Sequence, residues 1–95
     1  MPLSFDITAR APQSRARTGS LAFGDRIAET PAYVAVATNG YIRTLEPEDI
    51  PKTKTQIAIA NTYHLWQKLG DEGLEEYPGL HVGMEWKDGI NMTDS

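Results

Sequence analysis

The chain has 95 residues, a hydrophobic content of 40% and no cysteine, which suits one small α/β domain with a modest core but excludes disulfides and thiolate metal sites. Its net charge of -4 at pH 7 argues against a free-standing nucleic-acid binder whose affinity comes from neutralising phosphates. The apolar stretches fall far short of the roughly 20 residues of a membrane helix, and no signal-peptide pattern opens the chain. We therefore expect a cytoplasmic protein without a membrane segment.

The charges are distributed unevenly along the chain. Residues 1–26 carry four Arg against two Asp, a balance of +2, whereas residues 70–95 carry one Lys against seven Asp or Glu, a balance of -6. The acidic total does not exclude an RNA-modifying enzyme whose basic surface lies elsewhere.

The first thirty residues have the pattern of a small antiparallel sheet. Apolar and polar residues alternate from Leu3 to Thr8, which is typical of a half-buried strand. Residues 18–23 and 25–30 read as two more short strands around Gly24-Asp25, a dipeptide suited to a hairpin turn.

From Pro31 the pattern changes to that of a parallel sheet. Residues 32–38 are almost wholly apolar, as expected of a strand that is covered on both faces. Asn39-Gly40 signals a turn, and a short helix is expected near Pro47 with Thr44 or Glu46 as its cap. Residues 55–60 form the second apolar strand.

The rest of the chain completes an alternation of strands and helices. Leu65, Trp66 and Leu69 have helical spacing, and Gly70 is a good C-terminal stop. Residues 71–80 suggest another short helix or turn, and residues 90–95 a third strand. The order β, short α, β, α, β predicts a right-handed parallel α/β unit.

Polar residues follow each of the three predicted parallel strands. They are Thr38-Asn39, Asn61 to His64, and Thr93 to Ser95. Because functional groups in parallel α/β folds gather where the strands end, these residues are expected to form one polar rim.

Within this rim Asp94 is the best candidate acid or base, since a partly shielded carboxylate can have its pKa raised toward working pH. Asn61 and Thr62 either serve this site or merely cap the next helix. His64 is either a proton carrier or a packed, hydrogen-bonded residue, and His81 has less support than His64 for a chemical role.

The histidines give little support for metal binding, and the tryptophans give little support for the stacking of nucleobases. The two histidines lack a defined ligand spacing, so we expect no metal site in this chain. Trp66 and Trp86 fit core or interface anchors better than stacking platforms for nucleobases.

Several segments, taken in order, resemble the N-terminal part of tRNA-guanine transglycosylases, the queuine or archaeosine tRNA-ribosyltransferases. The resemblance covers essentially the whole chain, and its most specific pair is NTYHL with TDS. The similar segments are SRARTGSL, TPAYVAVAT, TLEPEDI, QIAIANTYHL, GLHVGMEW and MTDS.

The resemblance implies an incomplete TIM-like (β/α)8 barrel. Residues 1–30 would form the N-terminal antiparallel sheet, and residues 31–95 the first three β/α units of the barrel. The family exchanges a guanine base in tRNA for a 7-deazaguanine through a covalent enzyme–RNA intermediate, so tRNA and that base are the implied partners.

The resemblance also implies roles for individual residues. Asp94 matches a catalytic aspartate that contacts the base and handles protons, and Ser95 matches the next residue of the base-binding loop. Asn61 and Thr62 would lie beside Asp94 and orient it, while His64 would face the ribose side or a subunit contact.

By resemblance, the nucleophilic aspartate and the zinc site of the family lie outside residues 1–95, so we expect no cofactor in this chain and no exchange by the isolated chain. An oligomer is expected. The alternative function is that of a non-catalytic accessory or self-associating barrel fragment, a subunit of a split or heteromeric transglycosylase.

Overall fold

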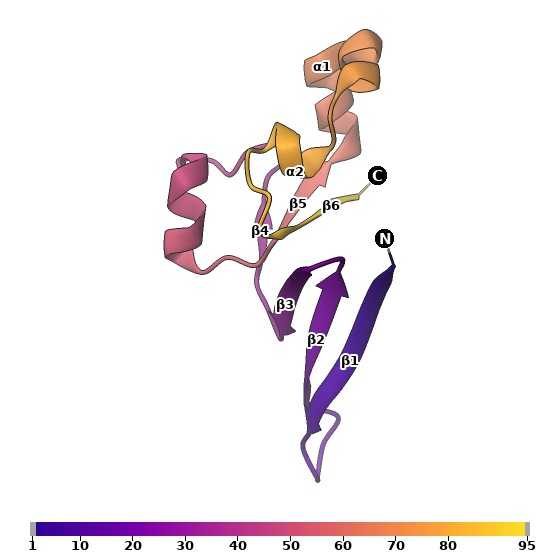
Figure 1. Ribbon diagram of the computed structural model, residues 1–95, viewed down its shortest axis with the longest axis vertical. Helices are drawn as coiled ribbons and strands as arrows, with labels where there is room; N and C mark the ends of the chain where they lie inside the picture. Colours follow the sequence, from indigo (N-terminus) through magenta and orange to yellow (C-terminus); the bar gives the residue numbers. More distant parts are fainter. Residues whose placement is uncertain (1, 95) are drawn as a thin grey trace.

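A computed structural model describes residues 2–94, which form two three-stranded sheets and three helical segments (Figure 1). The first sheet is antiparallel, in the order β1 (Leu3–Arg10), β2 (Arg17–Phe23) and β3 (Arg26–Thr30). The second is parallel, in the order β4 (Val34–Val36), β5 (Ile57–Asn61) and β6 (Ile90–Asp94). The helical segments are η1 (Pro47–Thr53), α1 (Thr62–Glu76) and α2 (Leu80–Gly83). The predicted α/β class with an N-terminal antiparallel sheet is confirmed.

The antiparallel sheet follows the sequence pattern closely. The turn at Gly24 has φ of 64°, a left-handed conformation that glycine adopts without a steric penalty. Gly19 in β2 is buried beneath the Phe5 ring, and any Cβ there would overlap that ring. The first strand extends two residues beyond the predicted end, to Arg10, after a register shift between Ile7 and Ala9.

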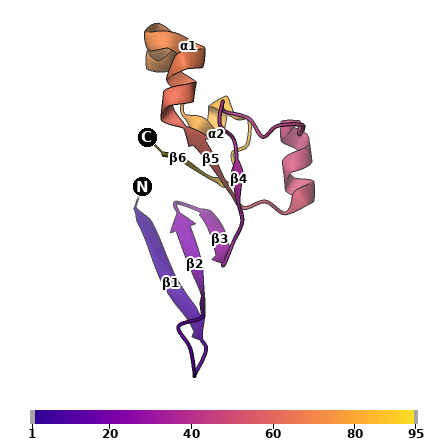
Figure 2. The same cartoon turned by 180° about the vertical axis from the view of Figure 1, so that it is seen from behind.

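The two sheets meet at a small shared core (Figure 2). Ala28 of β3 packs with Ile57 and Ile90, which begin the two neighbouring parallel strands. The Gln56 side chain reinforces this junction: its Oε1 accepts from the Glu29 N–H at 2.7 Å, and its Nε2 donates to the Glu29 carbonyl at 3.1 Å. A side-chain amide thereby pairs with a backbone edge as a strand would.

One face of the parallel sheet carries alanines that allow close packing by larger side chains. The buried residues of this cluster are Ala35, Ala37, Ala58, Ile50, Met84 and Trp86. On the opposite face, Ile57 and Ile90 at the start of the strands are buried, but the face is open further along: Val36 is 59% exposed and Met92 39%. The prediction that residues 32–38 are covered on both faces is therefore wrong for the described residues, because no described element packs over Val36.

The helices begin near the predicted positions, and the predicted stop at Gly70 and short helix after it are both found. Pro47 is the first residue of η1, and Asp49 Oδ2 accepts from the N–H of the cap residue Glu46 at 3.4 Å. Gly70, with φ of 73° and ψ of 176°, interrupts α1 at the predicted stop, and a second helical stretch continues to Glu76. No helix within residues 2–94 combines the length and the apolar character needed to cross a bilayer.

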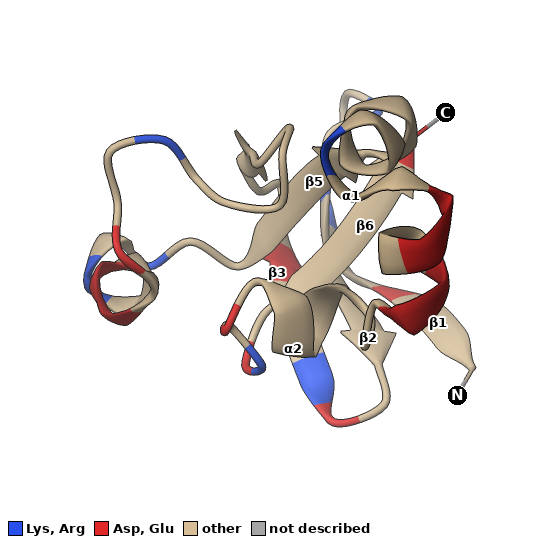
Figure 3. Ribbon diagram, turned by 90° about the horizontal axis from the view of Figure 1, so that it is seen from above, with Lys and Arg blue, Asp and Glu red and all other residues tan. Residues whose placement is uncertain are grey.

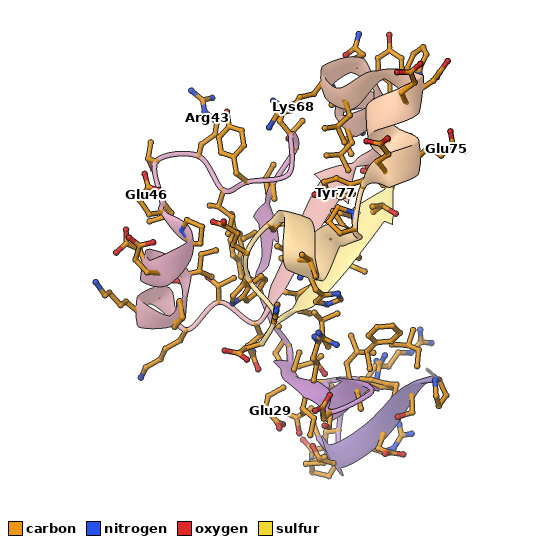
Figure 4. The ribbon with its side chains drawn as sticks, turned by 45° about the horizontal axis from the view of Figure 1, so that its top comes forward. Glu29, Arg43, Glu46, Lys68, Glu75 and Tyr77 are labelled. Atoms are coloured by element: carbon orange, nitrogen blue, oxygen red, sulfur yellow. The ribbon has the colours of Figure 1, made fainter. Side chains whose placement is uncertain are left out.

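The first half of α1 packs against the turn that follows β4 (Figure 4). Lys68 Nζ donates to the Asn39 carbonyl at 3.3 Å and lies 5.3 Å from the centre of the Tyr41 ring. Tyr77, which follows α1, lies against Gly40 and Gly83, where a Cβ on Gly83 would overlap the Tyr77 hydroxyl. These contacts position the N-terminus of α1 over the ends of β4 and β5.

Candidate functional site

The open face of the parallel sheet is built in rows by strand register. The lowest row is Val34, Ile57 and Ile90, and the next is Val36, Ile59 and Met92. Because side chains alternate between faces with a period of two, Thr38, Asn61 and Asp94 continue the same face. The sequence thus places two apolar rows beneath one polar row at the carboxyl ends of the strands.

Asn61 uses both ends of its side-chain amide. Its Oδ1 accepts from the His64 backbone N–H at 3.0 Å and caps α1, and its Nδ2 donates to Asp94 Oδ1 at 3.0 Å. The two readings of this position, helix cap and partner of the carboxylate, are therefore both correct. Asn suits this dual use because it offers an acceptor and a donor without a charge.

A cavity of about 260 Å³ opens above the apolar rows. Its lining residues are Val36, Thr38, Ile59, Ala60, Asn61, His64 and Asp94. Asp94 itself is exposed, and its Oδ2 makes no hydrogen bond with any described residue. One carboxylate oxygen is thus fixed by Asn61 while the other is free to face a ligand, in a space close to the lower limit of about 300 Å³ for small-molecule sites.

The predicted site residues separate into two groups. Asn61, His64 and Asp94 meet at the cavity. Thr62 opens α1 and is exposed, and its side chain makes no hydrogen bond to Asp94 in the described part of the chain, so an orienting role for Thr62 stays a prediction. Ser95 lies outside the described residues. Thr38 lines the cavity as well; its place in the rim was visible in the sequence, but only the register shows that it shares a face with Asn61.

An exposed aromatic group adjoins the cavity on the first two turns of α1. The Tyr63 ring lies 5.7 Å from that of His64 and 6.0 Å from that of Trp66, between ring centres. Tyr63 is 53% and Trp66 44% exposed, whereas Trp86 is buried. Of the two tryptophans, only Trp86 is therefore a core anchor in the described residues.

A larger cavity of about 500 Å³ borders β4 and the loop that follows it, and shares Val36 and Thr38 with the smaller cavity. Its walls include Tyr33, Tyr41 and Arg43 but contain no carboxylate. It lacks the fixed acid with a free oxygen that distinguishes the smaller cavity, so size alone does not identify the site.

Two groups away from the cavity have shifted pKa values. Burial lowers the pKa of His81, the Arg26 charge lowers it further, and a hydrogen bond of the His81 ring to the Gly89 backbone partly offsets both. Burial raises the pKa of Tyr77. His81 stacks on Phe23, with 6.2 Å between ring centres, and its Nε2 is buried without a partner among residues 2–94. His81 is thus a structural residue of the junction between the sheets.

The described residues do not provide a metal centre. Within residues 2–94 no three His, Cys, Asp or Glu side chains lie close enough together to bind one ion, and the sequence has no cysteine. The thiolate and imidazole ligands that zinc prefers are therefore not assembled in this part of the chain.

Comparison with known proteins decides the family. The family model described as queuine tRNA-ribosyltransferase matches residues 12–95. The chain belongs to the queuine tRNA-ribosyltransferase family. The resemblance carried by NTYHL and TDS is confirmed by this match, which covers the whole candidate site.

A curated member of the family is similar along the entire chain. The queuine tRNA-ribosyltransferase of Roseiflexus sp. (strain RS-1) is 43% identical over 95 residues, which is 100% of this chain. The chain spans 24% of the length of that relative. Residues 1–95 thus correspond to about a quarter of a queuine tRNA-ribosyltransferase.

Proposed function

We propose that residues 1–95 provide the base-handling wall of a cytoplasmic tRNA-guanine transglycosylase, which exchanges guanine in tRNA for a 7-deazaguanine. The observation that supports this most strongly is the hydrogen bond between Asn61 and Asp94 at the carboxyl ends of neighbouring strands. Family membership supplies the reaction class, and the cavity beside Asp94 supplies a place for the base.

In this proposal Asp94 carries a proton in both halves of the exchange. The nucleophilic aspartate that the resemblance assigns outside residues 1–95 bonds to the ribose carbon as the bond from that carbon to guanine breaks, and the protonated carboxyl of Asp94 gives its proton to the departing base. The resulting carboxylate then takes the proton that the incoming base loses as it bonds to the same carbon, so the enzyme returns to its starting state. Asn61 orients Asp94 without adding charge, and its Nδ2–H bond leaves Oδ2 for the base.

The remaining site residues surround this carboxyl. His64 contacts the ribose side of the substrate or a neighbouring subunit, Thr62 supports the orientation of Asp94, and Ser95 extends the base-binding wall. Because the target base must leave its stack to enter such a pocket, the neutral rim replaces stacking and pairing contacts with hydrogen bonds.

We propose further that the parallel sheet is the first part of a TIM-like (β/α)8 barrel. Branched side chains dominate the interior layers of such barrels, and all residues of the rows Val34, Ile57, Ile90 and Val36, Ile59, Met92 except Met92 are branched. In the described chain β4 and β6 each pair on one side only, which leaves an edge at each end of the sheet for further strands.

The rest of the enzyme completes the chemistry in this account. The family resemblance assigns the nucleophilic aspartate and the zinc ligands to segments outside residues 1–95, and residues 2–94 assemble no group of side chains that could hold the ion. Residues 1–95 alone are therefore proposed to be inactive and to require the other segments, in one chain or in an oligomer.

The test is a hybrid enzyme, in which residues 1–95 replace the matching segment of the Roseiflexus protein. The hybrid enzyme is expected to incorporate labelled guanine into unmodified tRNA, whereas residues 1–95 alone are not. A correctly folded hybrid enzyme without exchange would contradict the proposed function.

A second candidate function is that of a non-catalytic, self-associating subunit. The exposed apolar residues Val36 and Met92 favour it, because an open sheet face with unpaired edges promotes association. Light scattering of the 95-residue chain distinguishes the two: a monomer at high concentration would exclude self-association.

A further inference from the structure

The far end of the antiparallel sheet concentrates positive charge. Residues 10–17 contain three arginines and no acidic residue. Arg10 and Arg17 are directly opposite each other in the β1–β2 register, and Arg15 lies in the turn between them. Like charges placed opposite each other destabilise a strand pair, so this arrangement works against the stability of the hairpin itself.

None of these arginines is neutralised within the described residues. The ion pair found in residues 2–94 joins Lys52 and Asp49, in η1, and all three arginine side chains are exposed. An arginine is charged at every physiological pH and presents a fork of donors that matches phosphate oxygens. An uncompensated cluster of this kind suits an anionic partner.

The hairpin presents the arginines on an ordered backbone. Ala11 N–H donates to the Ala16 carbonyl at 2.9 Å, and Ala16 N–H donates to Ser14 Oγ at 3.2 Å, which fixes the turn. Thr8 and Thr18 share a hydroxyl hydrogen bond of 2.8 Å one step further along the strands. A preorganised loop loses little conformational entropy when it binds.

Two shallow hollows lie beside the arginines. One of about 380 Å³ is lined by Arg10 and Arg17, and the other, of about 270 Å³, by Arg15 and Arg17. Arg17 and Pro31 belong to both, so the three arginines border adjoining hollows on one surface. We call this surface, Arg10, Arg15 and Arg17, the hairpin patch.

The hairpin patch is remote from the candidate site. The molecule is 51 Å long, and Figures 1 and 2 show the β1–β2 turn at the opposite end from α1. Acidic residues instead gather on the second half of α1, at Asp71, Glu72, Glu75 and Glu76 (Figure 3). An RNA that reaches Asp94 and the hairpin patch would therefore avoid the acidic half of α1.

We propose that the hairpin patch binds the sugar–phosphate backbone of the tRNA, at nucleotides distant from the exchanged base. This inference rests on the proposed function, which supplies tRNA as the substrate. Phosphate contacts of this kind position the RNA without reading its sequence. The hairpin patch should thus contribute to tRNA affinity and its salt dependence, and should leave the chemical step unchanged.

The test measures tRNA binding by filter retention at several salt concentrations, together with kcat and KM for guanine exchange, in the hybrid enzyme. The variant is Arg10→Gln/Arg15→Gln/Arg17→Gln, and the matched control, Arg43→Gln/Lys52→Gln/Lys54→Gln, removes the same charge from exposed residues elsewhere. Each lost phosphate contact lowers the slope of log K against log salt by about 0.7–0.9. For three contacts we therefore expect a slope smaller by about two to three, a tRNA KM raised about tenfold or more, and kcat within about twofold.

Three results would overturn the proposal. They are an unchanged salt slope and KM in the hairpin variant, an equal loss in the control, or a loss of folded structure that accounts for the weaker binding. Replacement of the three arginines by lysine, which keeps the charge, should retain most of the salt slope. Failure of this inference leaves exchange by the unmodified hybrid enzyme intact, whereas failure of the proposed function abolishes exchange but not the binding measurement.

Discussion

Asn61 Nδ2 donates a hydrogen bond of 3.0 Å to Asp94 Oδ1, although the two residues are 33 positions apart in the sequence. They meet because β5 and β6 are parallel neighbours in which Asn61 pairs with Asp94 in register. The same amide caps α1 through His64. One side chain therefore couples the start of a helix to the orientation of the candidate catalytic carboxyl.

The two tasks of Asn61 can be separated by substitution. Ser is about as good an N-cap as Asn, but its shorter side chain does not reach Asp94 in the same way. Asn61→Ser in the hybrid enzyme is expected to change stability by less than about 0.5 kcal/mol and to reduce exchange substantially. Asn61→Ala should lose about 1 kcal/mol as well. Equal activity in the Ser variant and the original would show that the bond to Asp94 does not serve exchange.

Gly89 is required by the position of Trp86. Gly89 is buried, and a Cβ at this position would overlap the indole ring, which is itself 4% exposed. Gly89→Ala is expected to destabilise the chain by about 1–3 kcal/mol, the usual cost of overpacking. Urea denaturation would measure this, with Asp88→Ala at the exposed neighbouring position as the control. A midpoint equal to that of the control would contradict the packing described here.

The Gln56 side chain should protect the edge of β3. Its Oε1 accepts from the Glu29 N–H and its Nε2 donates to the Glu29 carbonyl. Gln56→Ala is expected to accelerate hydrogen exchange at the Glu29 amide, because that donor loses its partner. Gln56→Glu keeps an acceptor and should retain most of the protection. Equally fast exchange in both variants would assign the protection to something other than this bond.

The junction between the sheets should weaken in acid. Burial and Arg26 lower the pKa of His81 below 6.5, so the unfolded chain binds this proton more readily than the folded chain. The contribution of neutral His81 is full above pH 6.5 and is lost as pH falls toward its lower folded pKa.

His81→Phe keeps an aromatic ring beside Phe23 and cannot titrate. Urea midpoints measured at pH 7.5 and 5.5 should therefore differ less in this variant than in the original chain. An identical difference between the two pH values in both chains would show that His81 does not cause the acid sensitivity.

The sequence pattern was sufficient to predict where strands and helices occur, but not which of their faces are covered by other elements. The alternation of apolar and polar residues predicted β1, and runs of apolar residues predicted β4 and β5, because these signals are local in the sequence. The exposure of Val36 was not predictable in this way, since an apolar run does not show which element packs on it. The interruption at Gly70 and the short helical stretch after it were predictable, because a left-handed glycine is a local signal and residues 71–80 suggest another short helix or turn.

The meeting of Asn61 with Asp94 was predictable from the sequence, although their exact register was not. Asn61 and Asp94 each end an apolar strand, and parallel strands bring such ends together. The sequence could not show whether Asn61 caps α1 or binds Asp94, because the oxygen and the nitrogen of the same side-chain amide each make one of these hydrogen bonds. The His81 environment was also missed, since its neighbours Phe23 and Arg26 come from a different sheet.

The most direct test of the account is guanine exchange by the hybrid enzyme carrying Asp94→Asn. Asn keeps the size of the side chain but cannot give or take the proton, so kcat is expected to fall by about 100-fold or more, with folding and tRNA binding unchanged. Exchange at the rate of the unmodified hybrid enzyme would contradict the central claim that Asp94 handles the proton of the base.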